Sequence, residues 1–369
     1  MHPFAIGSVH RVGVVGRYNT PGIAKPLKRL AEFLVARGLA VCMETETAAL
    51  TRMPGYPTAS VAELGGQVDL VIVVGGDGTL LAVARQLAAR RIPLIGINQG
   101  RLGFLTDIAL AEMETALAEM FDGKLGVEER MLLQARVVRD GVELISGLAF
   151  NDVVVNRGGF GGMIDLSVGI GDSYVCDLRA DGVIVATPTG STAYAMSANG
   201  PIVHPSVRAW SLVPISPHAL TNRPIVIGDG ERVTITVTRA REAAMHWDGQ
   251  SHHDLREGDR IEIDAAPFSV RLLHPQGYDY YAMLRRKLHW SASPLSEDRG
   301  QKTEDRGQKT EDRRQSTEDR TNEAGAEARK TADGTARRTA DRVEKESDKT
   351  ENAGARALKS VRGRVRTKS

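Results

Sequence analysis

One segment near residue 75 constrains the fold of this chain more than any other. Residues 70–74 are almost entirely β-branched, which is typical of a strand buried on both faces. The strand runs directly into the glycine-rich segment 75–79, and residues 80–89 then return to the apolar spacing of a helix. A strand, a short glycine-rich connection and a helix in this order are typical of a parallel sheet with helical crossovers.

The same alternation extends over the first part of the chain. Strand-like apolar runs occupy residues 11–16, 39–43 and 93–97, and residues 23–37 have helical spacing. Strands that alternate with helices imply right-handed crossovers and a sheet covered on both faces. We therefore predict that residues 1–127 form a doubly wound α/β domain with a mostly parallel sheet.

From about residue 128 onward the pattern changes to closely spaced strands. Strand-like runs cover residues 134–139, 144–150, 153–156, 166–170, 182–186, 232–238 and 260–263. Turn signals such as Asp140-Gly141 and Asp229-Gly230 separate several of them. This pattern predicts an all-β, antiparallel domain over residues 128–274, followed within residues 275–296 by a C-terminal helix that we expect to return to the first domain.

The last 73 residues differ in composition from everything before them. Residues 297–369 carry 20 Lys or Arg and 16 Asp or Glu without an aromatic residue, which leaves 28 basic and 30 acidic residues for the first 296. A seven-residue unit, EDRGQKT, repeats there, but no repeat position is apolar and no coiled-coil seam can form. Such a segment cannot bury enough apolar surface to fold alone, so we expect a disordered charged tail. The basic run 359–368 leaves open a weak contact with nucleic acid.

Composition also narrows the classes of protein to consider. The two cysteines, Cys42 and Cys176, exclude a disulfide scaffold and a cysteine-rich zinc site. No apolar run approaches the roughly 18 residues that a membrane helix needs, and the first residues lack a signal-peptide pattern. The first 296 residues have no basic excess to neutralise nucleic-acid phosphates. We therefore expect a cytoplasmic protein with no membrane or nucleic-acid partner for its folded part.

The glycine-rich segment 75–79 is the first candidate for chemistry. Its glycines let the backbone approach a ligand, and the helix N-terminus behind them favours phosphate. Asp77 would repel an anion, so we interpret it as a base or as part of a metal shell, the alternative being a helix cap. The segment matches neither a Walker loop, because no Gly-Lys-Ser/Thr follows, nor Gly-x-Gly-x-x-Gly.

Three further segments carry polar groups where chemistry could occur. Residues 98–105 follow the next strand, so they would lie at the same carboxyl edge of the sheet, where ligands bind in such folds. Asn151-Asp152 is a polar pair in an apolar strand-like run, and its side chains would point to opposite faces. Residues 178–197 supply Asp181, a hydroxyl-rich loop and Tyr194, the groups that bind a polar heterocycle. Asp181 could instead be a turn residue and Tyr194 a core residue.

These segments resemble a known set of motifs. The set comprises residues 75–79, 98–105, 151–152, 181–182 and 187–194, whose order and spacing resemble those of bacterial NAD kinases. The resemblance runs from about residue 12 to residue 290. Its first motif also occurs in 6-phosphofructokinases and in diacylglycerol or sphingosine kinases, whereas the TPTGSTAY segment is far more specific. The fold that it implies is the NAD kinase/diacylglycerol kinase-like fold.

The activity implied by the resemblance is transfer of the γ-phosphoryl group of ATP to the 2′-hydroxyl of the adenosine ribose of NAD, giving NADP and ADP. Asp77 would accept the hydroxyl proton. The donor phosphates would be held by Mg²⁺ or another divalent metal ion, which is carried with ATP rather than by direct protein ligands, and by Gly75, Gly76, Gly78 and Thr79. Contacts with NAD are implied at Asp77, Gly78, Asn151, Asp152, Arg179, Asp181, Thr192, Ala193, Tyr194, Ala195, Met196, Ser197 and Gln250.

The resemblance also implies an assembly. It implies a homo-oligomer, a dimer or tetramer, whose neighbouring subunit completes an NAD pocket that lies between the two domains. In the family, a charged or polar residue at the position of Arg179 accompanies a preference for NAD over NADH, and we expect that preference here.

The chain departs from the family at several positions. Asp152 stands where relatives usually have glutamate, which keeps the charge and loses one methylene of reach. Residues 158–162 lack the His or Arg with which many relatives reach the NAD of a neighbouring subunit, so we do not expect that contact. His246, His252 and His253 lie close together without completing a zinc spacing, and we interpret them as surface or substrate-adjacent residues.

Two other functional classes remain as alternatives. A lipid kinase of the diacylglycerol type shares the Gly-Gly-Asp-Gly loop, but residues 189–192 are too polar for an acyl cleft. A module that senses NAD without turnover is the second alternative, and the presence of Asp77 argues against it.

The tail generates a first testable prediction. Deletion of residues 297–369 should leave folding and turnover nearly unchanged, within about twofold, because the segment has no core to contribute. The measurement is thermal unfolding of the truncated chain beside an assay of NADP formation. An insoluble or inactive truncated chain would show that the predicted domain boundary is wrong.

Overall fold

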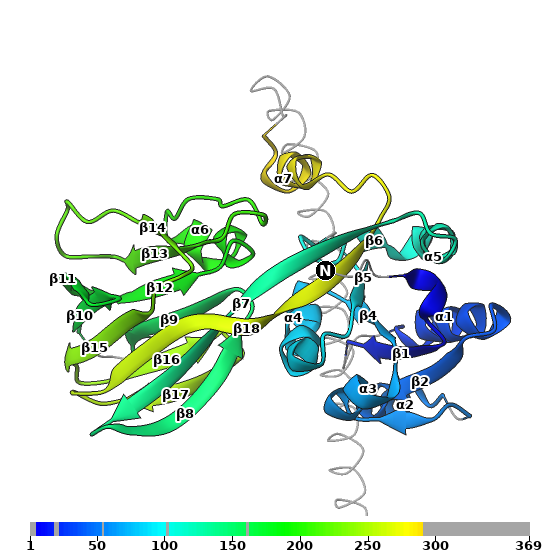
Figure 1. Ribbon diagram of the computed structural model, residues 1–369, viewed down its shortest axis with the longest axis horizontal. Helices are drawn as coiled ribbons and strands as arrows, with labels where there is room; N and C mark the ends of the chain where they lie inside the picture. The colour runs from blue at the N-terminus through cyan, green and yellow to red at the C-terminus, as the bar shows by residue number, and fades with distance from the viewer. Residues whose placement is uncertain (1–4, 18–21, 54, 101–102, 160–161, 291–369) are drawn as a thin grey trace, which may run out of the picture. The chain divides into compact units, whose positions relative to one another are not determined.

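The computed structural model of the chain describes residues 5–17, 22–53, 55–100, 103–159 and 162–290 (Figure 1). The expectations for the tail, residues 297–369, lie outside these described residues. The chain divides at Tyr280 into two compact units. The first unit contains every segment with predicted chemistry, and the second begins with helix α7.

The parallel sheet predicted for the first part of the chain is confirmed. Its strands are β1 (Arg11–Gly16), β2 (Ala40–Glu44), β3 (Thr58–Ala59), β4 (Leu70–Gly75) and β5 (Leu94–Asn98). They pair in the order β5-β4-β1-β2-β3, every pair parallel, and the two-residue β6 (Ile108–Ala109) adds to β5. Every residue of β4 is buried, as its β-branched run predicted.

Helices cover both faces of this sheet, as Figure 1 shows. They are α1 (Ala24–Ala36), α2 (Thr45–Thr51), α3 (Val61–Gln67), α4 (Asp77–Leu87) and α5 (Met113–Phe121), with single 3-10 turns at Ile6–Ser8, Ala88–Arg90 and Leu110–Glu112. Side chains of a strand alternate between faces. Ile72 accordingly packs in one core with α1 and α5, while Val71 and Val73 pack in a second core with α3 and α4.

The second part of the first unit is built from antiparallel strands. These are β7 (Leu125–Arg139), β8 (Val142–Ala149), β9 (Asp152–Arg157), β10 (Ile164–Ile170), β11 (Ser173–Ala180), β12 (Gly182–Ala186), β13 (Ala209–Ile215), β14 (Ile225–Gly228), β15 (Val233–Arg239), β16 (Ala243–Trp247), β17 (Ser251–Leu255) and β18 (Arg260–Pro275). Six of them form a separate sheet in the order β14-β13-β12-β9-β16-β17. A third core, which includes Trp210, Met245 and Ile261, joins this sheet to strands of the larger one.

Two long strands tie the α/β part to the β part. β7 and β18 pair antiparallel over almost their whole lengths, and β18 also pairs parallel with β5 at Leu272 and Leu94 (Figure 1). The sequence predicted only their distal ends, residues 134–139 and 260–263. The predicted boundary between residues 127 and 128 therefore falls inside β7. The charged residues 128–130 break the apolar pattern of that strand, and this is why its first half escaped the prediction.

Three short or terminal elements complete the description. The hydroxyl-rich loop contains a 3-10 turn, Gly190–Thr192, followed by the one-turn helix α6 (Tyr194–Ser197). The C-terminal helix expected over residues 278–290 is α7 (Tyr280–Leu288). Its last turn carries Arg285, Arg286 and Lys287, which complement the negative end of the helix dipole. Its return to the first domain stays a prediction.

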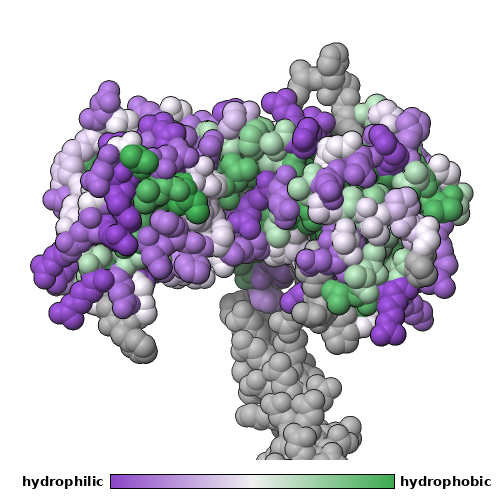
Figure 2. Space-filling model, turned by 90° about the horizontal axis from the view of Figure 1, so that it is seen from below, coloured by the Kyte–Doolittle hydropathy of each residue, from purple (hydrophilic) through white to green (hydrophobic). Residues whose placement is uncertain are grey.

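The face of the molecule that Figure 2 shows is mostly hydrophilic. Hydrophobic side chains gather in small groups on the face that Figure 2 shows. No helix in the described part of the chain has the length and apolar character needed to cross a membrane.

Candidate active site

The glycine-rich segment forms the junction between β4 and α4. Gly75 ends the strand, Gly76 is the N-cap residue in an extended conformation, and Asp77 is the first residue of the helix. Gly76 has no side chain to cap this helix, and the N–H of Thr79 donates to the carbonyl oxygen of Gly76 at 3.0 Å, so the N–H groups of Asp77 and Gly78 are those that a ligand could accept from. A helix N-terminus with free N–H groups favours an anion such as phosphate.

The side chain of Asp77 binds a neighbouring loop instead of capping its own helix. Its Oδ2 atom accepts a hydrogen bond from the N–H of Phe104 at 2.7 Å. Its Oδ1 atom accepts from the N–H groups of Leu105 (3.1 Å) and Thr106 (3.0 Å) and from the hydroxyl of Thr106 (2.9 Å). Asn98 in turn donates to that hydroxyl at 2.8 Å. Asn98 and residues 104–106 therefore fix the position of the Asp77 side chain, and because Gly76 occupies the N-cap position, Asp77 is not the helix cap.

Gly103 belongs to the same arrangement, and sequence reasoning missed its role. A Cβ atom at this position would lie 1.9 Å from Oδ1 of Asp77 and 2.4 Å from the hydroxyl oxygen of Thr106. A carboxylate and a hydroxyl that are already fixed by four hydrogen bonds cannot both move away. The second glycine of the motif 98–105 is thus required by the close approach of Asp77.

A buried carboxylate that sequence reasoning also missed fixes the Asn151-Asp152 segment. Asp248 accepts hydrogen bonds from the N–H groups of Phe150 (3.0 Å), Asn151 (2.7 Å) and Asp152 (3.1 Å). Its Oδ2 atom lies 3.4 Å from Nε of Arg85 on α4. In the sequence Asp248-Gly249 reads as an ordinary turn, and only the antiparallel register of β16 with β9 places it opposite Asp152.

Gln250 closes a second link between the two parts of the unit. Its Nε2 donates to the carbonyl oxygen of Gly78 at 2.8 Å, and its Oε1 accepts from Nη2 of Arg85 at 2.7 Å. Both links start from α4, the helix that begins at Asp77. The position of Asp77 is therefore tied directly to the turn between β16 and β17.

Two adjoining pockets bring several predicted residues together. One, of about 370 Å³, is lined by Asn151, Asp152, Val154, Asn156, Ala193, Tyr194, His246, Asp248 and Gly249. The other, of about 450 Å³, shares Asn156, Tyr194 and His246 with it and reaches Asp181. The pockets thus bring together three of the segments proposed for NAD, namely Asn151-Asp152, Asp181 and the segment 192–197. Tyr194 is 44% exposed, so its ring is available for stacking.

The electrostatics of the smaller pocket depend on two carboxyl groups. Burial and the charge of Asp248 raise the pKa of Asp152 to about 7. Burial also raises the pKa of Asp248, although its backbone hydrogen bonds and Arg85 oppose the shift. Near neutral pH the two carboxyl groups of Asp152 and Asp248 therefore share a proton. A hydroxyl group of a bound ligand could take the place of that proton by donating a hydrogen bond to the carboxylate.

His246 is the histidine that adjoins these pockets most closely. Its Nε2 lies 3.1 Å from Oδ1 of Asn156, and its ring centroid is 5.7 Å from that of His252. Burial, followed by the charge of His252, lowers the pKa of His246, so the neutral ring donates to Asn156. Within the described residues no group of three or more His, Cys, Asp or Glu is arranged to hold a metal ion.

Other predicted residues lie at varying distances from the pockets. Arg179 on β11 is exposed, lines neither pocket, and its Nε is 3.7 Å from Oδ1 of Asp165. Asp181 pairs with Nε of Arg157 at 2.8 Å. Ala195 on α6 is fully buried in a core cluster and lines neither pocket, so the structure does not place it against a ligand. Thr192, Met196 and Ser197 lie beside Tyr194 in the same loop and helix.

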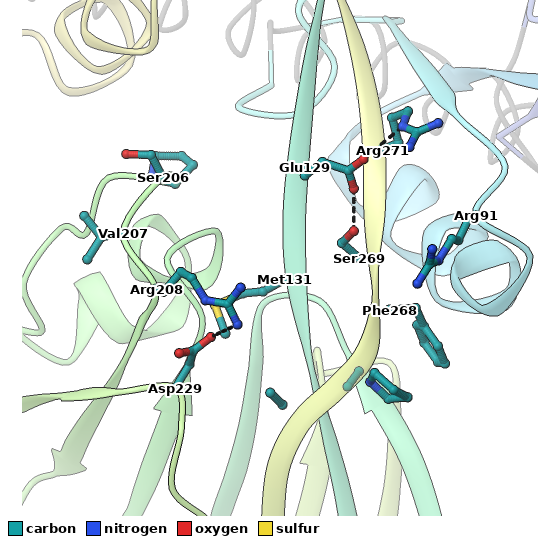
Figure 3. Close-up of a pocket in the computed structure, with 14 residues that line it drawn as sticks. Arg91, Glu129, Met131, Ser206, Val207, Arg208, Asp229, Phe268, Ser269 and Arg271 are labelled. Carbon is teal, nitrogen blue, oxygen red and sulfur yellow. Dashed lines mark hydrogen bonds and ion pairs between the residues drawn. The ribbon is translucent and has the colours of Figure 1, made fainter. Parts of the chain in front are cut away.

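A further pocket of the described residues lies elsewhere. It measures about 780 Å³ and contains none of the predicted residues (Figure 3). Its charged side chains are largely paired with one another: Glu129 with Arg271 and Ser269, and Arg208 with Asp229. This pocket is larger than the two pockets around Tyr194, but it offers none of the groups predicted for the chemistry. We therefore place the candidate active site at Asp77 and the two pockets around Tyr194.

Comparisons with known proteins identify the family of this chain. Residues 12–125 match the ATP-NAD kinase N-terminal domain and residues 150–275 match the ATP-NAD kinase C-terminal domain. An NAD kinase of Burkholderia multivorans is 51% identical over 287 residues, covering 78% of this chain and 96% of the relative, and one of Nitrosospira multiformis is 50% identical over 287 residues, covering 78% and 98%.

Solved structures give the same result for the fold. Yeast NADH kinase complexed with NADH has a TM-score of 0.71 at 25% identity, covering 77% of this chain and 89% of that one. An NAD kinase from Archaeoglobus fulgidus in complex with ATP has a TM-score of 0.59 at 28% identity, covering 76% and 98%. Because both domain models match and about half of the aligned residues are identical to those of relatives over nearly their whole length, this chain belongs to the NAD kinase family.

Proposed function

We propose that this chain is an ATP-dependent NAD kinase in which Asp77 is the catalytic base. The observation that carries the proposal is that four hydrogen bonds from Phe104, Leu105 and Thr106 fix the Asp77 carboxylate at the N-terminus of α4. Among the described residues, Oδ2 accepts one hydrogen bond, from Phe104, and keeps a lone pair for a substrate hydroxyl. The 2′-hydroxyl of the adenosine ribose would give its proton to this oxygen while its own oxygen bonds to the γ-phosphorus. The bond from the γ-phosphorus to the β-phosphate oxygen breaks, and ADP leaves.

The donor phosphates would bind at the beginning of α4. Gly75, Gly76, Gly78 and Thr79 surround its first N–H groups, and the positive end of the helix dipole favours the developing charge. A divalent cation, Mg²⁺ in our proposal, would enter with the phosphate oxygens of ATP and neutralise part of their charge. Phosphoryl transfer leaves little covalent chemistry to the protein, so this positioning is the main contribution of the chain.

The acceptor would bind in the two pockets around Tyr194. Its ring offers a stacking surface for a base, while Asp152 and Asn151 offer a carboxyl and an amide to ribose hydroxyls. The pair Arg157 and Asp181 supplies further polar contacts in the larger pocket. We also propose that the working form is a cytoplasmic homo-oligomer, as the sequence resemblance implied.

The role of Asp77 can be tested with Asp77→Asn. The amide keeps the size of the side chain but cannot take a proton, so kcat should fall about 10²–10⁴-fold while NAD affinity changes little. The measurements are steady-state NADP formation and calorimetric titration with NAD. Thr106→Ala is the matched control, because it removes one hydrogen bond to Asp77 and leaves its carboxylate in place, and it should lose much less. Turnover of Asp77→Asn within a few-fold of the parent would exclude Asp77 as the base.

The paired carboxyls predict a pH dependence of stability. The folded pKa of Asp152, about 7, lies above its unfolded value of 3.8, so ionisation destabilises the fold increasingly between these values and fully above pH 7. Asp152→Asn removes this charge, and its Tm advantage should be absent at pH 4 and reach roughly 2–4 °C at pH 8. Calorimetric melting curves across that range measure it. Asp181→Asn, which breaks the ion pair with Arg157, is the control and should gain nothing, and a pH-independent advantage of Asp152→Asn would refute the argument.

Acceptor choice gives a further prediction at Arg179. We expect the parent chain to use NAD better than NADH, and Arg179→Gly to reduce the ratio of the two kcat/KM values severalfold. Kinetics with both acceptors measure this ratio, and Arg208→Gly, at the remote pocket, should leave it unchanged. Equal activity of the parent chain on NADH would remove the basis for assigning this role to Arg179.

A further inference from the structure

A group of buried charged side chains outside the two pockets has no part in the scheme above. It consists of Asp107, Glu128, Arg130 and His274, here called the His274 cluster. Nδ1 of His274 lies 3.0 Å from Oδ2 of Asp107, and its Nε2 lies 3.2 Å from Oε2 of Glu128. Nη2 of Arg130 donates to the same oxygen of Glu128 at 2.7 Å. The side chains of His274 and Arg130 are only 2% and 3% exposed.

The two ends of the His274 cluster reach the two halves of the proposed active site. At one end, Asp107 directly follows Thr106, whose N–H and hydroxyl both bind the Asp77 carboxylate. At the other end, Nη1 of Arg130 donates to the hydroxyl oxygen of Thr189 at 3.2 Å. The carbonyl oxygen of Thr189 in turn accepts from the hydroxyl of Thr192 at 3.2 Å. A continuous series of polar contacts thus runs from the proposed base to the loop that carries Tyr194.

The contacts of His274, which lie in the middle of this series, require its ring to be positively charged. Both ring nitrogens of His274 face carboxylate oxygens, which cannot donate, so both nitrogens must carry a proton. Burial lowers the pKa of His274, but the hydrogen bonds to Asp107 and Glu128 and their charges outweigh it, and the net pKa is raised. The other ionisable groups that face the ring are Arg130 and Tyr278, which stacks on it with centroids 4.1 Å apart, and Tyr280 lies near Tyr278.

The cluster is not arranged for stability alone. A largely buried set of four charges, of which only the Glu128 side chain is 23% exposed, is seldom more stable than well-packed apolar residues of the same volume. Among the described residues, Oδ1 of Asp107 and Nε of Arg130 are buried without a hydrogen-bond partner, which adds to the cost. The charged hydrogen bonds instead fix the relative orientation of the residues they join, because each contact has a preferred angle as well as a preferred distance.

We propose that His274, Glu128 and Arg130 are positioning residues that hold the loop around Asp77 and the loop around Thr189 in one fixed relation. The proposal rests on Asp77 as the base and on the Thr189–Tyr194 segment as part of the acceptor site. A shift of about 1 Å between reacting groups can cost about 100-fold in rate. Loss of a contact in the middle of the series therefore lowers kcat without removing any group that touches a substrate.

The test uses variants that break one contact at a time in the full-length chain. His274→Gln retains an amide near the position of Nε2 and loses the link to Asp107, whereas His274→Asn retains the link to Asp107 and loses that to Glu128. Thr189→Val removes only the hydroxyl at the far end and serves as the second route should the histidine variants fold poorly. His10→Gln, at an exposed histidine on the edge of β1, is the matched control.

Two readouts separate positioning from a merely structural role. The kcat of each cluster variant should fall about 10- to 100-fold with KM for NAD changed less, and His10→Gln should match the parent. Hydrogen exchange at the amides of residues 104–106 should accelerate in all three variants, including Thr189→Val, whose change lies at the opposite end of the series. The parent should lose kcat as the pH rises through the raised pKa of His274, above 6.5, and His274→Gln should lack this decline.

The outcomes distinguish this inference from the proposed function. Lower Tm with unchanged kcat, pH profile and exchange at residues 104–106 would overturn the positioning role. A parent chain that forms no NADP would overturn the proposed function, while the exchange measurement would still decide whether the two loops are coupled.

Discussion

The arrangement of the site depends on one buried carboxylate, that of Asp248. A carboxylate without solvent is costly unless donors surround it, and here three consecutive backbone N–H groups and Arg85 do so. These partners come from two different parts of the first unit, since Arg85 lies on α4 and the N–H groups lie at the start of β9. Satisfying this one charge therefore fixes the helix that begins at Asp77 against the strand that begins at Asp152.

The long β7–β18 pair extends this constraint across the unit. Because side chains alternate along a strand, its two faces serve different purposes. Glu129, Met131, Ser269 and Arg271 point to the large pocket of Figure 3. Glu128 and Arg130 point the other way, toward His274 and Thr189. A slip of one residue in the register of this pair would exchange the two faces, so the 15 residues of β7 and the 16 residues of β18 must be aligned for the candidate site to form.

The sequence predicted the parts of the molecule whose patterns are local. The all-buried strand β4, the parallel sheet around it and the family itself follow from apolar runs and from the set of motifs that includes the TPTGSTAY segment. The first half of β7 did not follow, because its charged residues are buried in partnership with residues about 140 positions away, such as Arg271 with Glu129. The roles of Gly103 and Asp248 could not be predicted for the same reason, because these residues act only where segments distant in the sequence come together in the fold. The site residues that line the pockets remain a prediction until a ligand is observed there.

The hold on Asp77 also bears on how such a residue can act as a base. Four donors around one carboxylate satisfy much of its capacity to accept hydrogen bonds, which favours placement over base strength. In a loose transition state of phosphoryl transfer the attacking oxygen acquires little charge until its bond to phosphorus has begun to form. The proton can then leave late, when the hydroxyl has become acidic, and a weak base in the right position is sufficient. The contacts of this site serve mainly to fix the position of Asp77, through Gly103, Thr106 and Asn98. Such precise placement is what this chemistry requires.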